Sequence, residues 1–272
     1  MTLSKLVLPL FFILFIACQS DDETEEQQQS NLIAFTPKTT FDWDLRSELP
    51  LNSQYSSDII DIDAFDNSEA LVTELHSQNK KVIAYISVGS VESWRSDAGD
   101  FPASIIGNNY DGWDGEKFLD IRNIDALAPI MRARLDMIKT KGFDAVEPDN
   151  IDSYTNATGF DISEQDVIKY CKWLANEAHS RGLSIGQKNA TELSEQLVDT
   201  FDWILLEGAF NEGIENEAQI YITKNKAVFA TEYDDDMTVE AFKANVCPKA
   251  KTLQYSAIFK HRELDAYRVA CD

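Results

Sequence analysis

Two acidic residues, Asp149 and Glu207, stand at the ends of short β-prone runs, where a pair of carboxylates can act as acid, base or nucleophile. Asp149 follows the run Ala145–Glu147 after a proline, and Glu207 ends the apolar run Trp203–Leu206. We expect this apolar setting to raise the pKa of the Glu207 carboxyl, which suits a general acid. Hydrolysis of a glycosidic bond needs such a pair, with one acid for the leaving oxygen and one nucleophile or base. The sequence therefore predicts Asp149 and Glu207 as catalytic residues.

The ends of the other β-prone runs carry polar and aromatic side chains that suit sugar binding. Aromatic faces stack on the apolar faces of sugar rings, and carboxylates and amides bind hydroxyl groups. A single acid after a strand is more often a helix cap or a turn former, and only the number of such strand ends indicates a binding site. The expected substrate-binding residues are Trp43, Asp63, Tyr85, Ser87, Trp94, Asn150, Asp152, Lys188, Asn189, Glu232 and Tyr233, with Trp113 and Tyr154 as further aromatics beyond strand ends.

Eight β-prone runs alternate with helical stretches, and this repetition predicts how the polar ends come together. The predicted strands are Phe41–Leu45, Ile59–Ile62, Val82–Ser87, Ala145–Glu147, Ser184–Gln187, Trp203–Glu207, Ala227–Glu232 and Leu253–Phe259. The pattern is typical of an α/β protein with a single domain, a (β/α)8 TIM barrel whose ligand site lies at the C-terminal ends of the strands. An open doubly wound sheet is the alternative, but the chain lacks a glycine-rich turn after its first strand.

The longest helical stretches have their own start and stop signals. Ser163 is an N-cap with Asp166 three residues further on, and Gly142 and Gly182 follow helices at the position where a positive φ is needed. Apolar residues recur with helical periodicity in the ranges Glu69–Gln78, Asp125–Lys141 and Ser163–Ala178.

The first residues resemble the export signal of a bacterial lipoprotein. Lys5 precedes the apolar stretch Leu6–Ala17, which is shorter than the roughly 20 residues of a membrane span and runs into Cys18. We therefore predict a lipoprotein signal peptide at 1–17, lipidation of Cys18, a disordered acidic tether at 18–31 and the barrel at 32–272. The lipid is expected to anchor the chain to the outer membrane or the cell surface, with a periplasm-facing position as an alternative. An ordinary signal peptide followed by a chance cysteine is the other interpretation.

Composition limits the partners of the chain. The 272 residues carry a formal net charge of −23, with an isoelectric point near 4.4. Such a surface repels phosphate backbones, so no nucleic-acid partner is expected, and a neutral or cationic ligand fits better. The three histidines show no metal-ligand spacing and no Cys-x-x-Cys occurs, so no metal and no cofactor are expected. Cys247 and Cys271 form a candidate disulfide, and we expect a monomer.

The order and spacing of several motifs resemble glycoside hydrolase family 114, the endo-α-1,4-polygalactosaminidase-type barrels. The matching stretches begin near residue 36 and reach the C-terminus. They are FDWDL at 41–45, DIDAFD at 61–66, VIAYISVGSVESWRSD at 82–97, WDGEKFLDIRN at 113–123, GFDAVEPDNIDSY at 142–154, IGQKN at 185–189, ILLEGAF at 204–210 and FATEYD at 229–234.

This resemblance implies an endo-acting hydrolase of α-1,4-linked galactosamine or N-acetylgalactosamine polymers. The aspartate of EPDN and the glutamate of LLEGAF are then Asp149 and Glu207. The resemblance further implies a retaining mechanism with Asp149 as nucleophile and Glu207 as acid/base, although the two roles can be exchanged. A cationic amino-sugar polymer agrees with the acidic composition. A non-catalytic glycan-binding surface lipoprotein is the competing interpretation, and the distance between the two carboxyl groups distinguishes them.

Overall fold

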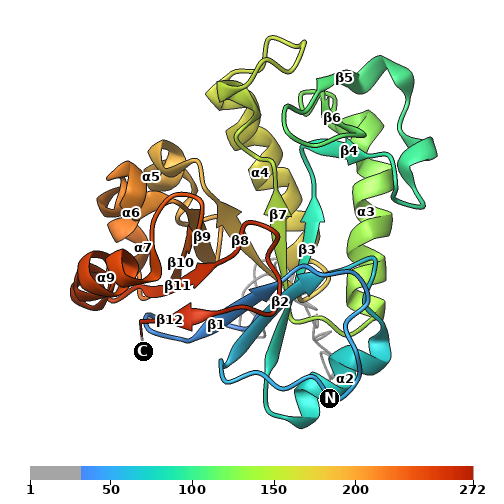
Figure 1. Ribbon diagram of the computed structural model, residues 1–272. Helices are drawn as coiled ribbons and strands as arrows, with labels where there is room; N and C mark the ends of the chain where they lie inside the picture. Colours follow the sequence, from blue (N-terminus) through green and yellow to red (C-terminus); the bar gives the residue numbers. More distant parts are fainter. Residues whose placement is uncertain (1–31, 272) are drawn as a thin grey trace, which may run out of the picture.

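The computed structural model describes residues 32–271, and its centre is a sheet of eight parallel strands curled into a TIM barrel (Figure 1). All eight predicted strands are present, with ends that differ from the prediction by a few residues. They are β1 (Phe41–Asp44), β2 (Ile59–Asp63), β3 (Lys81–Ser87), β7 (Ala145–Asp149), β8 (Ser184–Lys188), β9 (Trp203–Glu207), β10 (Val228–Tyr233) and β11 (Ser256–Lys260). The predicted signal peptide at 1–17, the predicted lipidation of Cys18 and the predicted tether at 18–31 lie outside the described residues.

The barrel has a seam between its last and first strands. In the described chain the hydrogen-bonded ladder runs from β1 to β11 and continues to the antiparallel strand β12 (Val269–Ala270). Side chains cross from this end to β1: the Arg268 guanidinium donates to the carbonyl oxygen of Phe41 at 2.9 Å, and the ammonium of Lys260 lies 3.1 Å from the Asp42 carboxylate. The C-terminal segment therefore closes the barrel.

Two apolar cores hold the strands in place, one inside the barrel and one between the strands and the helices. Phe41, Trp203 and Phe229 fill the lower interior, and their rings pack at centroid distances of 4.7–5.5 Å. Gly186 makes room for the Trp203 indole, since a β-carbon at this position would lie 2.5 Å from the ring. The floor of the barrel is therefore apolar and closed, and polar side chains are left to the opposite end.

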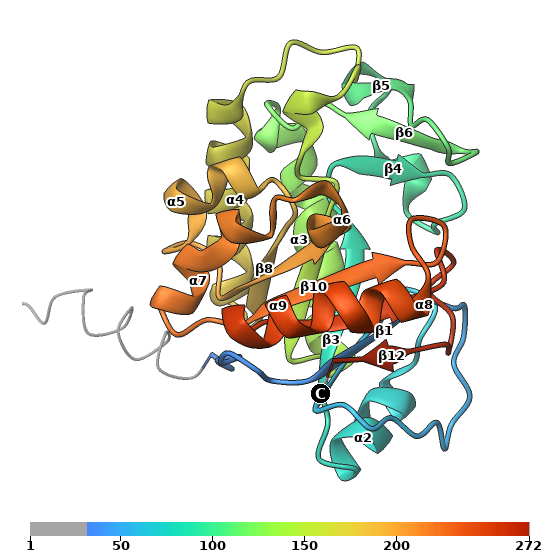
Figure 2. The same ribbon diagram turned by 60° about the vertical axis from the view of Figure 1, so that its left-hand side comes forward.

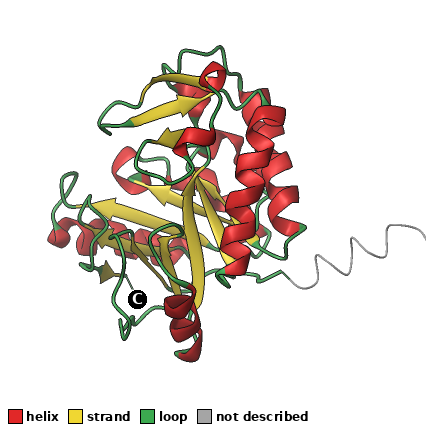
Figure 3. Cartoon of the chain, turned by 90° about the vertical axis from the view of Figure 1, so that its right-hand side faces the viewer, coloured by secondary structure: helices red, strands yellow, loops and turns green. Residues whose placement is uncertain are grey.

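Helices cover the outside of the strands (Figure 3). The three long ones are α2 (Glu69–Ser77), α3 (Ile124–Thr140) and α4 (Glu164–His179). Ser163 and Asp166 form the predicted capping box of α4, and Gly142 and Gly182 have the predicted positive φ after α3 and α4. The later crossovers use the short helices α5 (Ser194–Leu197), α6 (Ala209–Glu212), α7 (Gln219–Thr223), α8 (Val239–Ala241) and α9 (Cys247–Leu253).

Two local expectations were wrong. A helix after every strand was expected, but residues 45–58 between β1 and β2 contain none. Leu253 was expected to start the last strand, but it ends α9, and Gln254 adopts a left-handed φ of 64° before β11 begins. The apolar Leu253 side chain packs against the outer core instead.

The connection between β3 and α3 carries an inserted antiparallel sheet of β4 (Ser90–Glu92), β5 (Ile106–Asn109) and β6 (Glu116–Leu119). β3 leads directly into β4, so the inserted sheet stands over the C-terminal end of the barrel (Figures 1 and 2). None of the helices within residues 32–271 is long and apolar enough to cross a membrane.

A disulfide between Cys247 and Cys271 joins the start of α9 to the C-terminal segment, with a Cα–Cα distance of 5.0 Å. Cys171 is a buried free thiol on α4. Because the bridge secures the segment that closes the barrel seam, it restrains both the unfolded chain and the last strands.

Replacing both bridge cysteines, Cys247→Ala with Cys271→Ala, should lower the free energy of unfolding by roughly 3 kcal/mol. The midpoint of thermal unfolding should fall by roughly 5–10 °C. Calorimetry with and without dithiothreitol tests this, because the reductant should lower the midpoint of the wild type and leave that of the double variant unchanged. A wild-type midpoint that does not respond to reduction would contradict a stabilising bridge.

Candidate active site

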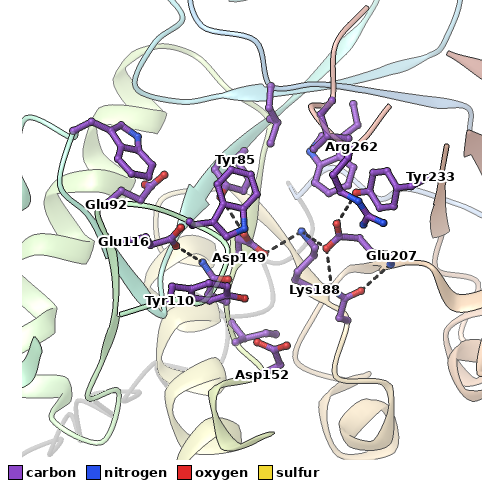
Figure 4. Close-up of a pocket in the computed structure, with 18 residues that line it drawn as sticks. Tyr85, Glu92, Tyr110, Glu116, Asp149, Asp152, Lys188, Glu207, Tyr233 and Arg262 are labelled. Atoms are coloured by element: carbon purple, nitrogen blue, oxygen red, sulfur yellow. Dashed lines mark hydrogen bonds and ion pairs between the residues drawn. The ribbon is translucent and has the colours of Figure 1, made fainter. Parts of the chain in front are cut away.

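A cleft of about 250 Å³ opens at the C-terminal end of the barrel (Figure 4). The barrel strands provide its floor, the inserted sheet provides one wall, and the loop after β11 provides another. Its lining residues are Trp43, Leu45, Tyr85, Glu92, Trp94, Tyr110, Trp113, Glu116, Asp149, Asn150, Ile151, Asp152, Lys188, Asn189, Glu207, Tyr233, Arg262 and Leu264. The site thus lies where parallel barrel strands present their final residues.

The ammonium group of Lys188 brings the two predicted catalytic carboxylates together at the floor of this cleft. Its Nζ lies 3.0 Å from Oδ1 of Asp149 and 3.1 Å from Oε2 of Glu207 (Figure 4). These two oxygens are therefore no more than about 6 Å apart. The Lys188 side chain is 4% exposed, against 20% for Asp149 and 29% for Glu207, so the carboxylates face the cleft and the ammonium lies beneath them.

Asp149 is held by its own strand end and by β3. The Tyr85 hydroxyl donates to Oδ2 of Asp149 at 3.0 Å, and the backbone N–H of Val88 donates to the Asp149 carbonyl at 3.0 Å. The next residue, Asn150, has a left-handed φ of 66°. Gly89 packs against it so closely that a β-carbon would lie 1.7 Å from the Asn150 carbonyl oxygen. A glycine is therefore required where the inserted sheet begins.

Glu207 accepts hydrogen bonds from two neutral donors in addition to Lys188. The Asn189 amide donates to Oε2 at 3.0 Å, and the Tyr233 hydroxyl donates to Oε1 at 2.5 Å. The Asn189 side-chain oxygen in turn accepts from the backbone N–H of Glu207 at 2.8 Å. Asn189 and Ala190 both adopt a positive φ, a conformation that residues other than glycine rarely keep unless the surroundings enforce it.

The pKa of Glu207 differs from the sequence-based expectation. Burial alone would raise it, as expected, but the positive charge of Lys188 and the hydrogen bonds from Tyr233 and Asn189 lower the pKa of this carboxyl below its ordinary value. The expectation was wrong because the apolar run that precedes Glu207 gives no sign of the donors supplied by β8 and β10. In the free protein Glu207 is therefore a carboxylate down to acidic pH.

Two cation–π contacts complete the floor. Lys188 Nζ lies 4.5 Å from the centre of the Trp43 ring, and the Arg262 guanidinium lies 3.8 Å from the centre of the Tyr233 ring. Arg262 also pairs with Asp235 at 2.6 Å and with Asp236 at 2.8 Å. The Arg262 contact holds the Tyr233 ring in the position from which its hydroxyl reaches Glu207. The neutral Trp43 ring covers the Lys188 ammonium without competing as an anion with the carboxylates.

Most of the predicted substrate-binding residues line the cleft, but three do not. Asp63 is buried and paired with the Arg95 guanidinium at 2.5 Å. Ser87 is buried in a hydrogen-bonded cluster with Ser90, and Glu232 accepts from the backbone N–H groups of Phe210 and Asn211. Their positions at strand ends suggested a role at the cleft, whereas their side chains stabilise loops behind it. Those that line the cleft are Trp43, Tyr85, Trp94, Asn150, Asp152, Lys188, Asn189 and Tyr233.

Four polar residues that also line the cleft were not predicted from the sequence: Glu92, Tyr110, Glu116 and Arg262. The first three belong to the inserted sheet and the loops between its strands, which resembled ordinary polar loops. Burial raises the pKa of Glu116 to about 7, and burial together with the nearby Asp149 raises that of Asp152 to about 6. The WDGEKFLDIRN stretch was the available signal for Glu116.

Two tryptophans stand out from the wall formed by the inserted sheet and its flanking loops. Trp94 is 53% exposed and Trp113 is 56% exposed, although large aromatic side chains are usually buried. Both line the cleft. Exposed aromatic faces beside a carboxylate pair suit a ligand that has both apolar faces and polar edges.

A second hollow of about 450 Å³ continues from the cleft and shares Asp152, Asn189, Glu207 and Arg262 with it. Further acids line this hollow, namely Glu192, Glu212 and Asp236. The carboxylate pair therefore lies within a groove that extends past it, so the site can accommodate a chain-like ligand.

Within residues 32–271 no three His, Cys, Asp or Glu side chains are grouped as metal ligands. Each histidine is paired with an aspartate: His76 with Asp144, His179 with Asp202, and His261 with Asp265. The polar side chains that line the cleft carry carboxyl, hydroxyl, amide, ammonium and guanidinium groups.

Comparisons with known proteins agree with this geometry. The family model described as Glycoside-hydrolase family GH114 matches residues 22–272. The crystal structure of Aspergillus fumigatus Ega3 in complex with galactosamine is 32% identical, covers 88% of this chain and 97% of its own, and has a TM-score of 0.83. No curated protein sequence matches.

Two more distant structures share the fold. The glycoside hydrolase domain of PelA from Pseudomonas aeruginosa is 14% identical, covers 85% of this chain and 98% of its own, and has a TM-score of 0.67. A GH18 chitinase from Pseudoalteromonas aurantia is also 14% identical, covers 82% of this chain and 94% of its own, and has a TM-score of 0.53.

Replacing the bridging lysine, Lys188→Met, should raise the pKa of Glu207 by at least about one unit, because burial then acts without the nearby positive charge. Carbon-13 NMR of the labelled glutamate carboxyl groups measures this shift directly in the free protein. Lys260→Met is the matched control, since Lys260 is also buried but pairs with Asp42. An unchanged Glu207 pKa in Lys188→Met would show that the ammonium does not control this carboxylate.

Proposed function

The chain belongs to glycoside hydrolase family GH114, and from this premise we propose that it cleaves α-1,4-linked galactosamine-containing polysaccharide at internal bonds. The observation that carries the proposal is the position of Asp149 and Glu207, which share one ammonium at the floor of an open groove. Paired carboxylates at this spacing serve hydrolysis of a glycosidic bond, whereas a binding protein would need only the aromatic wall.

We propose a retaining mechanism with two steps. Asp149 attacks the anomeric carbon as nucleophile while Glu207 protonates the leaving oxygen, and Glu207 then activates the water that releases the sugar from Asp149. A separation of about 5–5.5 Å is typical of retaining enzymes and one of about 6.5–9.5 Å of inverting enzymes. The upper limit of about 6 Å between the two oxygens nearest Lys188 favours retention.

The low pKa of Glu207 has a consequence for the pH dependence of this reaction. A general acid must carry its proton, and Lys188 favours the ionised form of Glu207. The value of kcat/KM, which reports on the free enzyme, should therefore fall as the pH rises through the Glu207 pKa, on the acidic side of neutrality. Activity should therefore be lost well before neutral pH, because Lys188 favours the ionised form of Glu207.

The groove suits a cationic substrate. The chain carries a net charge of −23, and the acids Asp152, Glu192, Glu212 and Asp236 lie along the part of the groove that continues from the catalytic pair. Such a surface raises the local concentration of an amino-sugar polymer and loses this advantage as salt screens the charges. The galactosamine bound by Ega3 belongs to the same class of sugar.

Removal of either carboxylate tests the chemistry. Asp149→Asn and Glu207→Gln should each lower kcat on partly deacetylated α-1,4-galactosamine polymer by at least roughly a thousandfold, measured as new reducing ends. Asp234→Asn is the matched control, because Asp234 also follows a barrel strand but lies outside the cleft. Activity of both catalytic-site variants equal to that of the control would refute the assignment and favour a glycan-binding protein.

The exposed tryptophans should bind substrate without contributing to the fold. Trp94→Ala and Trp113→Ala should each change the free energy of unfolding by less than about 0.5 kcal/mol. Loss of about 1 kcal/mol of stacking should raise KM for the polymer roughly fivefold with little change in kcat. Leu51→Ala is the control, since Leu51 is 52% exposed and lies outside the cleft. An unchanged KM in both tryptophan variants would exclude a role for this wall in binding.

A further inference from the structure

We propose that Asp61 and Glu147 form a buried pair that shares one proton beneath Lys188, with Asp61 as the neutral acid and Glu147 as the anion, and that this pair positions and tunes the catalytic carboxylates. The proposal rests on the hydrolytic function proposed above. Neither residue contacts the cleft, so both act through Lys188 and are positioning residues.

The pair lies inside the barrel, one layer below the catalytic residues. Asp61 on β2 and Glu147 on β7 are both 0% exposed, and the two strands flank β3. Glu147 and Asp149 are two residues apart on one strand, so their side chains point to the same face, with Glu147 deeper in the barrel. Asp61 is the middle residue of β2 and lies in the interior of the barrel.

Lys188 links this deeper layer to the catalytic layer. Its Nζ lies 2.8 Å from Oε1 of Glu147, in addition to its contacts with Asp149 and Glu207. The ammonium donates a hydrogen bond to Glu147 and forms ion pairs with Asp149 and Glu207. Glu147 therefore holds the Lys188 ammonium in position beneath the catalytic pair.

The remaining oxygens of the pair show where a proton must be. No N–H or O–H donor of the described residues reaches Oε2 of Glu147 or either oxygen of Asp61. The negative charge of Glu147 acts on Asp61 inside the closed barrel interior. A fully buried carboxyl group that no donor reaches is costly to ionise, so one member of the pair is protonated and its O–H can donate to the other.

The local charges assign this proton to Asp61. Glu147 has the direct ion pair with Lys188, whereas Asp61 has none. Burial raises the pKa of Asp61 well above its ordinary value, and the negative charge of Glu147 raises it further. Burial also raises the pKa of Glu147, but Lys188 opposes this. The titratable and charged groups that face the pair from the packed strands are Asp149, Lys188 and Tyr85, with Glu207 and Tyr233 beyond Lys188.

A neutral Asp61 limits the negative charge that surrounds Lys188. One ammonium faces three carboxylates, and a fourth buried anion at Asp61 would have no partner. With Asp61 neutral, its O–H stabilises the Glu147 anion, and that anion draws part of the Lys188 charge away from Asp149 and Glu207. The pKa of Glu207 is then low, but less so than it would be if Lys188 served the catalytic pair alone.

Two substitutions of nearly equal shape distinguish a neutral Asp61 from an ionised one. Glu147→Gln removes a negative charge beneath Lys188, so the alkaline limb of the kcat/KM profile should move to lower pH by roughly half a unit or more. Asp61→Asn keeps a donor toward Glu147 and removes no charge, so the alkaline limb should stay within about 0.2 unit of the wild type. Asp61→Leu removes the O–H that stabilises the Glu147 anion. The alkaline limb should therefore move in the same direction as in Glu147→Gln.

The outcome that overturns the proposal is equally specific. If Asp61 is ionised in the native protein, Asp61→Asn removes a charge and shifts the limb as far as Glu147→Gln does. If the pair is only structural, the variants change thermal stability and leave the pH profile in place. A pH profile that is shifted in Asp61→Leu but matches the wild type in Asp61→Asn is the result that a merely structural role would not give.

An infrared measurement tests the proton without any turnover. The difference spectrum of wild type minus Asp61→Asn at neutral pH should contain the carbonyl stretch of a neutral carboxylic acid. Absence of this band overturns the proposal, whether or not the protein hydrolyses the polymer. A protein that shows the band but cleaves no amino-sugar polymer would instead refute the proposed function and leave the shared proton established.

Discussion

The ammonium of Lys188 is the interaction on which the rest of the site depends. It reaches three carboxylates at 2.8–3.1 Å, one below it inside the barrel and two above it at the cleft. Without it, two acids at this distance in a low-dielectric pocket would repel each other and one would be neutralised. With it, the pKa of Glu207 lies below its ordinary value although Asp149 is adjacent, and the Trp43 ring covers the ammonium from the side of β1.

The fold supplies this arrangement through the alternation of side chains along parallel strands. Glu147 and Asp149 on β7 both point inward because they are two residues apart, and Lys188 and Glu207 end the next two strands. The backbone turns sharply directly after the catalytic strand ends, where Asn150 and Asn189 take a positive φ and Gly89 passes against Asn150. Strained turns of this kind persist where the surroundings fix them, as the inserted sheet and the side-chain hydrogen bonds do here.

Much of the architecture could be predicted from the sequence, because it depends on local patterns. The strands, the capping box at Ser163 and the glycine stops at Gly142 and Gly182 each depend on a few neighbouring residues. The direction of the Glu207 pKa could not be predicted, since it depends on donors from β8 and β10. For the same reason Asp63 and Glu232 resembled cleft residues, while their true partners, Arg95 and the backbone of α6, became clear only in three dimensions. The inserted sheet was missed as a wall because its short strands resemble polar loops.

The central claim is that Lys188 holds Asp149 and Glu207 close enough to act on one glycosidic bond from opposite sides with a covalent intermediate. The most direct test is the configuration of the reducing end that forms first when an α-1,4-galactosamine oligomer is cleaved, followed by proton NMR before the anomers equilibrate. The α configuration should appear first, because two successive displacements retain it. Initial appearance of the β anomer would mean that water attacks directly, and it would contradict the proposed role of Asp149 as nucleophile.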